Sequence, residues 1–161
     1  MYEKIRRRTE ALKREYGLKI HPEGGWFAED YTCGDKADGR ALMGSIYFLL
    51  DGAELSHFHQ IDCDELWYYH EGCGLLLTLL YRGEKQQIVL GADPALGQKM
   101  AVLIPKGAIF AAENLNWSKY TFLSCATAPQ FSYEGFRLVG REELKRDWPE
   151  FAADVEYLAM E

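Results

Sequence analysis

Short apolar segments separated by turn residues fill the middle of this chain and constrain its fold more than any other feature. After the apolar run ALMGSIYFLL, strand-length segments fall at residues 55–59, 65–70, 75–81, 86–90, 100–104 and 120–126. Glycine, aspartate or proline marks the turns at residues 51–52, 72, 82–83, 91–97 and 105–107. Many short strands at this spacing are typical of an antiparallel sandwich or barrel. We therefore predict an all-β fold.

The two ends of the chain have helical character instead. Near the N-terminus, apolar side chains recur three, four or seven residues apart, at Tyr2, Ile5, Leu12 and Tyr16. Gly17 is suited to ending such a helix. Residues 141–160 are helical in composition again, with an interruption at Trp148-Pro149. The chain has no linker or repeat, so we predict one domain over residues 1–161: a helix at about 1–17, a barrel at about 18–139 and a helical segment at about 140–160.

Charge and hydropathy narrow the class of partner. The formal net charge is -7, from 25 acidic and 18 basic residues, and an acidic surface repels the phosphates of nucleic acids. The longest apolar runs are only strand-length, so we expect no membrane span. The N-terminus is charged from its third residue and lacks the apolar segment of a secretory signal. We expect a cytoplasmic protein with reduced cysteines and a small-molecule partner.

The stretch SHFHQIDCDELWYYHEG, residues 56–72, contains the most distinctive polar pattern. Side chains two apart on a strand point to the same face, so His57 and His59 project together. On the following strand, Glu65, Trp67 and Tyr69 share one face. If the two strands pair, His57, His59 and Glu65 can converge on Fe, Mn, Ni or Zn. The alternative is a buried histidine–glutamate pair that binds no metal.

Further candidates for a ligand pocket lie on other predicted strands. Phe27, Glu29 and Tyr31 fall on one face by the period of two, and Glu29 and Tyr31 would add polar groups beside His59 and Glu65. An aromatic lining suited to a flat or sugar-like ligand is predicted from Tyr47, Trp67, Tyr69 and Phe110. The alternative for each aromatic residue is ordinary core packing.

The spacing around the two histidines resembles the first motif of the cupin superfamily, G-x5-HxH-x(3,4)-E-x6-G, with one-residue shifts in two gaps. The second motif is matched in part by Gly97, Pro105-Lys106-Gly107 and Asn114. Phe110 stands where the superfamily has a metal-binding histidine. The resemblance therefore implies, at most, a metal site of two histidines and one carboxylate.

A narrower resemblance extends from about residue 21 to residue 148. The segments HPEGGWFAEDY, SIYFLL, DELW, PKGAIFAAE and CATAPQFSYEGFRL are similar to the cupin-5 family, whose function is unknown. In that family a histidine at the position of His59 and the run Asp64-Glu65-x-Trp67 are usual, whereas a histidine at the position of His57 is not. The resemblance implies an antiparallel double-stranded β-helix, the cupin or jelly-roll barrel, in a homodimer. It also implies a loose, fold-level likeness to sugar epimerases.

Three functions follow from these residues. In the first, a metal-independent isomerase or epimerase acts on a sugar-like or keto substrate: His59 is the general base, Glu65 orients it, and Tyr31, Tyr47 or Tyr69 donates a proton. In the second, His57, His59 and Glu65 hold a divalent metal for an oxygenase or isomerase. In the third, the pocket binds a ligand without chemistry. We favour the isomerase slightly.

Overall fold

The structure is a computed structural model that describes residues 2–161. The helices are α1 Tyr2–Glu15, α2 Arg141–Asp147 and α3 Pro149–Val155, with short 3-10 turns at Pro94–Leu96, Tyr133–Gly135 and Glu156–Leu158. The strands are β1 Lys19–Ile20, β2 Trp26–Thr32, β3 Lys36–Ala37, β4 Arg40–Ala41, β5 Gly44–Asp51, β6 Leu55–Gln60, β7 Asp64–Gly72, β8 Leu75–Tyr81, β9 Glu84–Leu90, β10 Ala101–Ile104, β11 Ile109–Asn114, β12 Tyr120–Ala128 and β13 Arg137–Leu138.

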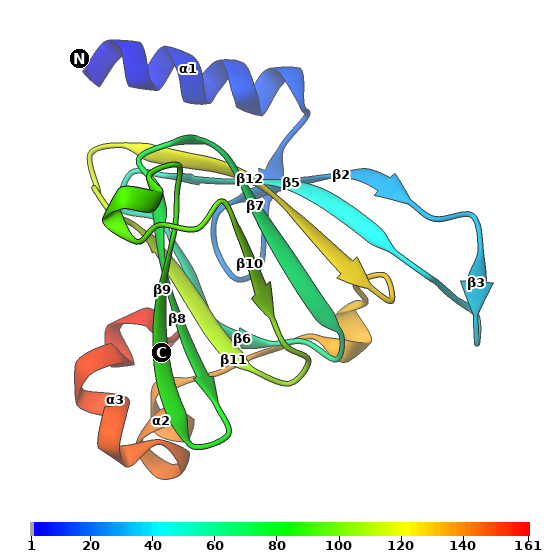
Figure 1. The fold of residues 1–161 in the computed structure, drawn as a ribbon, viewed down its shortest axis with the longest axis vertical. Helices are drawn as coiled ribbons and strands as arrows, with labels where there is room; N and C mark the ends of the chain where they lie inside the picture. Colours follow the sequence, from blue (N-terminus) through cyan, green and yellow to red (C-terminus); the bar gives the residue numbers. More distant parts are fainter. Residues whose placement is uncertain (1) are drawn as a thin grey trace.

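Two antiparallel sheets form the barrel (Figure 1). One has six strands in the order β1-β2-β5-β12-β7-β10, and the other has five in the order β13-β6-β11-β8-β9. Strands that are distant in the sequence pair directly, as β5 does with β12 and β6 with β11. The predicted all-β cupin barrel with a helix at each end is confirmed.

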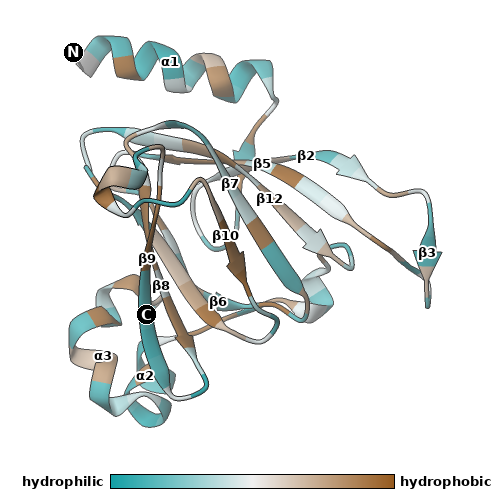
Figure 2. Cartoon of the chain, viewed as in Figure 1, coloured by the Kyte–Doolittle hydropathy of each residue, from teal (hydrophilic) through white to brown (hydrophobic). Residues whose placement is uncertain are grey.

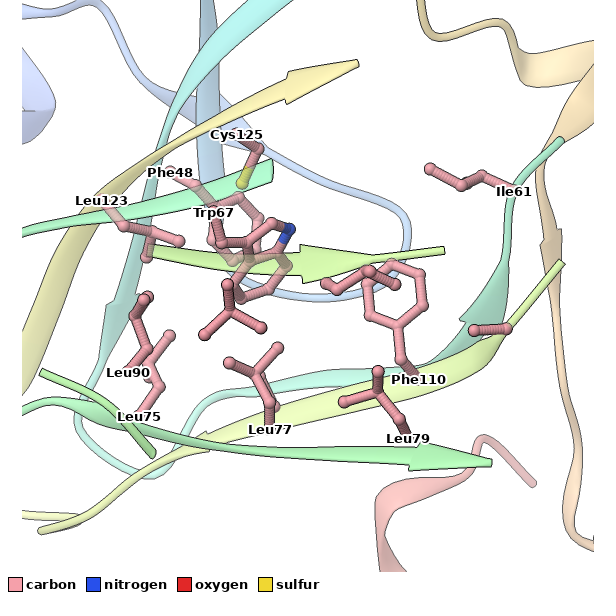
Figure 3. Close-up of a cluster of buried hydrophobic side chains, with 14 of the residues drawn as sticks. Phe48, Ile61, Trp67, Leu75, Leu77, Leu79, Leu90, Phe110, Leu123 and Cys125 are labelled. Carbon is pink, nitrogen blue, oxygen red and sulfur yellow. The ribbon is translucent and has the colours of Figure 1, made fainter. Parts of the chain in front are cut away.

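The core lies between the two sheets. Phe48 and Trp67 enter it from the six-stranded sheet, and Leu77 and Phe110 enter from the five-stranded sheet (Figure 3). All four are buried, because the period of two sends every second side chain of these strands inward. Apolar residues accordingly run along the strands of both sheets (Figure 2). This core fills one end of the barrel and leaves polar side chains at the other.

Helix α1 lies across the outer face of the six-stranded sheet (Figure 1). Leu12 is buried against Leu49 and Phe122, which are the outward-facing residues of β5 and β12. The Arg8 guanidinium donates two hydrogen bonds to the Glu71 carboxylate, at 2.7 and 2.8 Å. One apolar face and a few ion pairs therefore fix the helix on the sheet.

Helices α2 and α3 cover the other side of the barrel. Leu144 and Val155 pack on Phe58 and Ile109, whose side chains point outward from β6 and β11. No described helix has the length and apolar character needed to cross a membrane. Both sheets therefore have an inner face in the core and an outer face partly covered by a terminal helix.

Candidate functional site

A cavity of about 110 Å³ opens at the end of the barrel that the apolar core leaves unfilled. Its walls come from β2, β5, β6, β7 and β12, and from the chain segments before β2 and after β12. Phe27, Ile46 and Phe48 form an apolar side. The lining also includes three glutamates and two histidines, so a mainly apolar chamber holds a concentrated set of titratable groups.

Glu23 is the centre of the polar wall, on the loop between β1 and β2. Its carboxyl accepts a hydrogen bond from the Ser56 hydroxyl at 2.7 Å. The other carboxyl oxygen lies 3.1 Å from His59 Nε2 and 3.3 Å from His21 Nδ1. Glu23 and His21 are each only 6% exposed, and His59 is 2% exposed. Four buried polar side chains thus form one connected network.

The hydrogen bonds fix which atoms carry protons. His59 Nδ1 lies 2.7 Å from the His57 carbonyl oxygen, which can only accept, so Nδ1 is the protonated nitrogen. In a neutral imidazole, Nε2 is then an acceptor. Its partner Glu23 must therefore donate, and the carboxyl carries the proton. The alternative, an imidazolium beside a carboxylate, places two charges on side chains that are almost fully buried.

Burial favours the neutral arrangement. Desolvation raises the pKa of Glu23 well above its ordinary value, and the nearby Glu65 carboxyl raises it further, while the Ser56 hydrogen bond opposes both. Desolvation also lowers the pKa of His59 to about 3 and that of His21 to about 4. These directions agree with a protonated Glu23 between two neutral imidazoles.

Glu65 faces the cavity from β7 and is 8% exposed. Burial raises its pKa from an ordinary value near 4.5 to about 7, and the Trp67 indole N–H and the Cys125 thiol partly oppose the rise. Burial keeps the Cys125 thiol itself protonated, because its pKa lies well above the ordinary value. Glu65 is therefore the cavity group that changes charge near neutral pH.

The mouth of the cavity carries tyrosine and glutamate side chains. Tyr31 is 52% exposed and Tyr133 is 55% exposed, so both phenols are accessible from solvent. Burial raises the pKa of Tyr133. Tyr133 and Tyr31 are both part of the cavity lining, so the two phenols border the opening.

Six of the residues predicted from the sequence line the cavity together: Phe27, Glu29, Tyr31, His59, Glu65 and Trp67. The others lie elsewhere. Tyr47 points outward and packs under α1, with its ring 4.5 Å from that of Tyr16. The Tyr69 hydroxyl donates to the Gly72 carbonyl oxygen at 2.9 Å. Phe110 lies behind the His59 ring, 4.0 Å between centroids, as part of the core.

His57 does not join the predicted metal ligands. Its Nδ1 donates to the Glu23 carbonyl oxygen at 2.7 Å, and its ring lies outside the cavity lining. His59 has both ring nitrogens engaged, by the His57 carbonyl and the Glu23 carboxyl. Within residues 2–161 no group of three or more His, Cys, Asp or Glu side chains is arranged to hold a metal ion. The donor set predicted for Fe, Mn, Ni or Zn therefore does not fit the geometry.

Sequence reasoning missed Glu23 and His21, and with them the partner of His59. The expected carboxylate beside His59 was Glu65, but the contact is made by Glu23. Both missed residues belong to the turn HPEGG, which has no periodicity to show where its side chains point. Their spacing of two, in the segment just before a cavity strand, was the available signal.

The backbone of this turn is fixed tightly to β6. Gly24 has φ +104°, and a Cβ at this position would lie 2.0 Å from the Leu55 carbonyl oxygen. We expect Gly24→Ala to lower the free energy of unfolding by about 3 kcal/mol and to displace Glu23 from His59. Gly17→Ala is the control, because Gly17 also has positive φ but has no atom near its Cβ position, and should cost only about 1 kcal/mol. Urea unfolding measures both; equal losses would contradict the close approach at Gly24.

Comparisons with known proteins identify the family. A family profile described as cupin superfamily (DUF985) matches residues 10–139. Protein SO0799 from Shewanella oneidensis is 32% identical, with a TM-score of 0.89 over 94% of this chain and 96% of that one. A hypothetical protein from Leishmania major is 26% identical, with a TM-score of 0.88 over 94% and 98%. Among curated proteins, none matches the chain.

Oxalate decarboxylase from Bacillus subtilis is a more distant structural relative. It is 13% identical, with a TM-score of 0.58 over 86% of this chain and 36% of that one, and this likeness shows the fold alone. The strand order of the two sheets and the family match over residues 10–139 indicate the same fold. The chain therefore belongs to the DUF985 family of the cupin superfamily.

Proposed function

We propose that this protein binds a small molecule in the barrel cavity and transfers a proton beside a carbonyl group of a sugar-like or keto substrate, as an isomerase or epimerase does, without a metal ion. The observation that carries the proposal is Glu65: a buried carboxyl in a ligand-sized cavity, with a pKa of about 7. A general base works best when its pKa lies near the working pH. Desolvation by the cavity provides this match.

Epimerisation requires a second group that returns a proton. Glu23 belongs to a different wall from Glu65, and it carries a proton in the hydrogen-bonded network with His59 and His21. In the proposed step, the Glu65 carboxylate takes the proton from the carbon next to the carbonyl. Glu23 then gives its proton to the resulting enolate, and the hydrogen bond that this proton made to His59 Nε2 is broken in the same step. The neutral imidazole of His59 holds Glu23 in place and is a positioning residue in this mechanism.

Two carboxyls with different proton affinities are a common basis for acid–base pairs in enzymes. The hydrogen bond to His59 Nε2 holds a proton on Glu23, whereas Glu65 has a pKa of about 7, so one group can donate while the other accepts. Tyr31 and Tyr133 at the mouth are placed to contact the outer part of a substrate.

Hydrogen–deuterium exchange in deuterated water tests the proposal. The protein is incubated with small cyclic ketones and with free ketoses, and NMR follows the loss of protons next to the carbonyl. Because the base form of Glu65 is required, we expect the exchange rate to rise with pH through about 7 and then to level off. Glu65→Gln should slow the exchange by about 10²- to 10⁴-fold, and Glu84→Gln, at the exposed first residue of β9, should leave it unchanged.

Two results would contradict the proposal. Ligands that bind but show no exchange above the buffer rate would make the cavity a binding module. Exchange that follows the metal content of the preparation, measured by elemental analysis and removed by a chelator, would assign the chemistry to a metal.

A further inference from the structure

Trp67 has a polar atom that the rest of the protein does not use. The residue is 1% exposed, and its indole Nε1 has no hydrogen-bond partner among the described residues. Buried polar groups are nearly always paired, because an unpaired donor in a dry environment is costly. An indole N–H can only donate, so the missing partner is an acceptor.

The position of Trp67 directs this donor toward the cavity. The ring packs against Phe48 and Phe110 in the core, at 5.8 and 6.0 Å between centroids. Figure 3 shows its nitrogen turned away from the leucines of the five-stranded sheet, and Trp67 itself is part of the cavity lining. Glu65, two residues earlier on the same face of β7, also lines the cavity and is close enough for the indole to lower the pKa of its carboxyl, but no hydrogen bond joins the two side chains. Both side chains therefore face the floor of the cavity.

The rest of the lining limits the charge of the ligand. It contains Glu23, Glu29 and Glu65 but no lysine or arginine among the described residues. His21 and His59 are engaged with Glu23 and are not available as cations for a ligand. A buried carboxylate or phosphate without a positive partner is strongly disfavoured. The acceptor oxygen must therefore belong to an uncharged group.

The volume of the cavity limits the size of the ligand. A dry protein cavity of about 150 Å³ takes a molecule as large as benzene. The cavity here is about 110 Å³, so the buried part of the ligand has a comparable or smaller number of atoms. A sugar ring or a longer substituent would extend toward Tyr31 and Tyr133 at the mouth.

We propose that the cavity floor is a subsite for an uncharged carbonyl group, whose oxygen accepts a hydrogen bond from the Trp67 indole N–H. The ligand class is a small neutral ketone, lactone or amide, and keto acids are rejected. This inference deepens the proposed function and rests on the cavity being the ligand site. It also places the carbonyl next to the proposed base.

Binding of matched probes tests this subsite independently of catalysis. Cyclohexanone, δ-valerolactone and δ-valerolactam are titrated into ¹⁵N-labelled protein, with methylcyclohexane and cyclohexanecarboxylate as the apolar and anionic controls. The Trp67 indole signal is identified by its loss in Trp67→Phe. We expect the carbonyl probes, and neither control, to move this signal downfield, as a new hydrogen bond does.

Trp67→Phe should weaken binding of the carbonyl probes about tenfold, which is the usual effect of losing one hydrogen bond. Trp117→Phe is the matched control, because the Trp117 indole donates to Glu113 away from the cavity and is not part of its lining. An unchanged Trp67 signal with all three carbonyl probes, or tighter binding of the carboxylate, would overturn the inference. If the carbonyl probes shift the Trp67 indole signal but show no deuterium exchange, the carbonyl subsite is supported and the proposed proton transfer is contradicted.

Discussion

Glutamine in place of Glu65 is expected to slow proton exchange by about 10²- to 10⁴-fold and, at the same time, to stabilise the folded protein by about 3 kcal/mol at pH 8. The first effect is the usual contribution of a general base. The second follows from the raised pKa. Between pH 4.5 and about 7 the folded protein holds a proton on Glu65 that the unfolded chain has lost, so stability falls as the pH rises through this range.

The neutral amide of the glutamine variant does not ionise, so burying it causes no loss of stability as the pH rises. The free energies of unfolding of Glu65→Gln and of the natural protein should therefore be equal near pH 4 and should diverge until about pH 7. Urea titrations at pH 4, 6 and 8 measure the difference. A constant difference across this range would show that Glu65 titrates normally, and the proposed base would then have no support.

Glu23→Ala is expected to lower the free energy of unfolding by about 3–5 kcal/mol, because it leaves buried polar atoms of Ser56 and His59 without partners. Glu23→Gln should cost less than about 1 kcal/mol. The glutamine carbonyl can accept from the Ser56 hydroxyl. Its amide N–H can donate to His59 Nε2, as the protonated carboxyl does, while His21 Nδ1 keeps the hydrogen bond that it accepts from the backbone N–H of residue 23.

The pair of variants thus reports the protonation of Glu23. Were the network a carboxylate beside an imidazolium, glutamine would leave a buried charge unpaired and would destabilise the protein about as much as alanine does. Thermal and urea unfolding at pH 7 distinguish the two cases. The imidazole ¹⁵N chemical shifts of His59 give a second measurement, since a protonated Nδ1 and an unprotonated Nε2 have widely separated values.

The fold was accessible from the sequence because its signals are local. Alternation along β5 and β7 sends Phe48 and Trp67 inward, because the period of two comes from the backbone of the strand itself. The same rule placed Phe27, Glu29 and Tyr31 on the cavity side of β2. It did not place Tyr47, because alternation defines two faces without saying which one is interior; packing under α1 made that choice.

The sequence by itself therefore determined the β-barrel, the terminal helices and several cavity residues, His59 and Glu65 among them. Only the tertiary structure decided the partner of His59. The HPEGG turn is aperiodic, and the position of Glu23 depends on hydrogen bonds to β6 that link residues more than thirty positions apart. The strongly shifted pKa values have the same origin, because desolvation of Glu23 and Glu65 results from packing the two sheets around them. Periodicity is a property of a strand, whereas burial and long-range hydrogen bonds are properties of the assembled barrel.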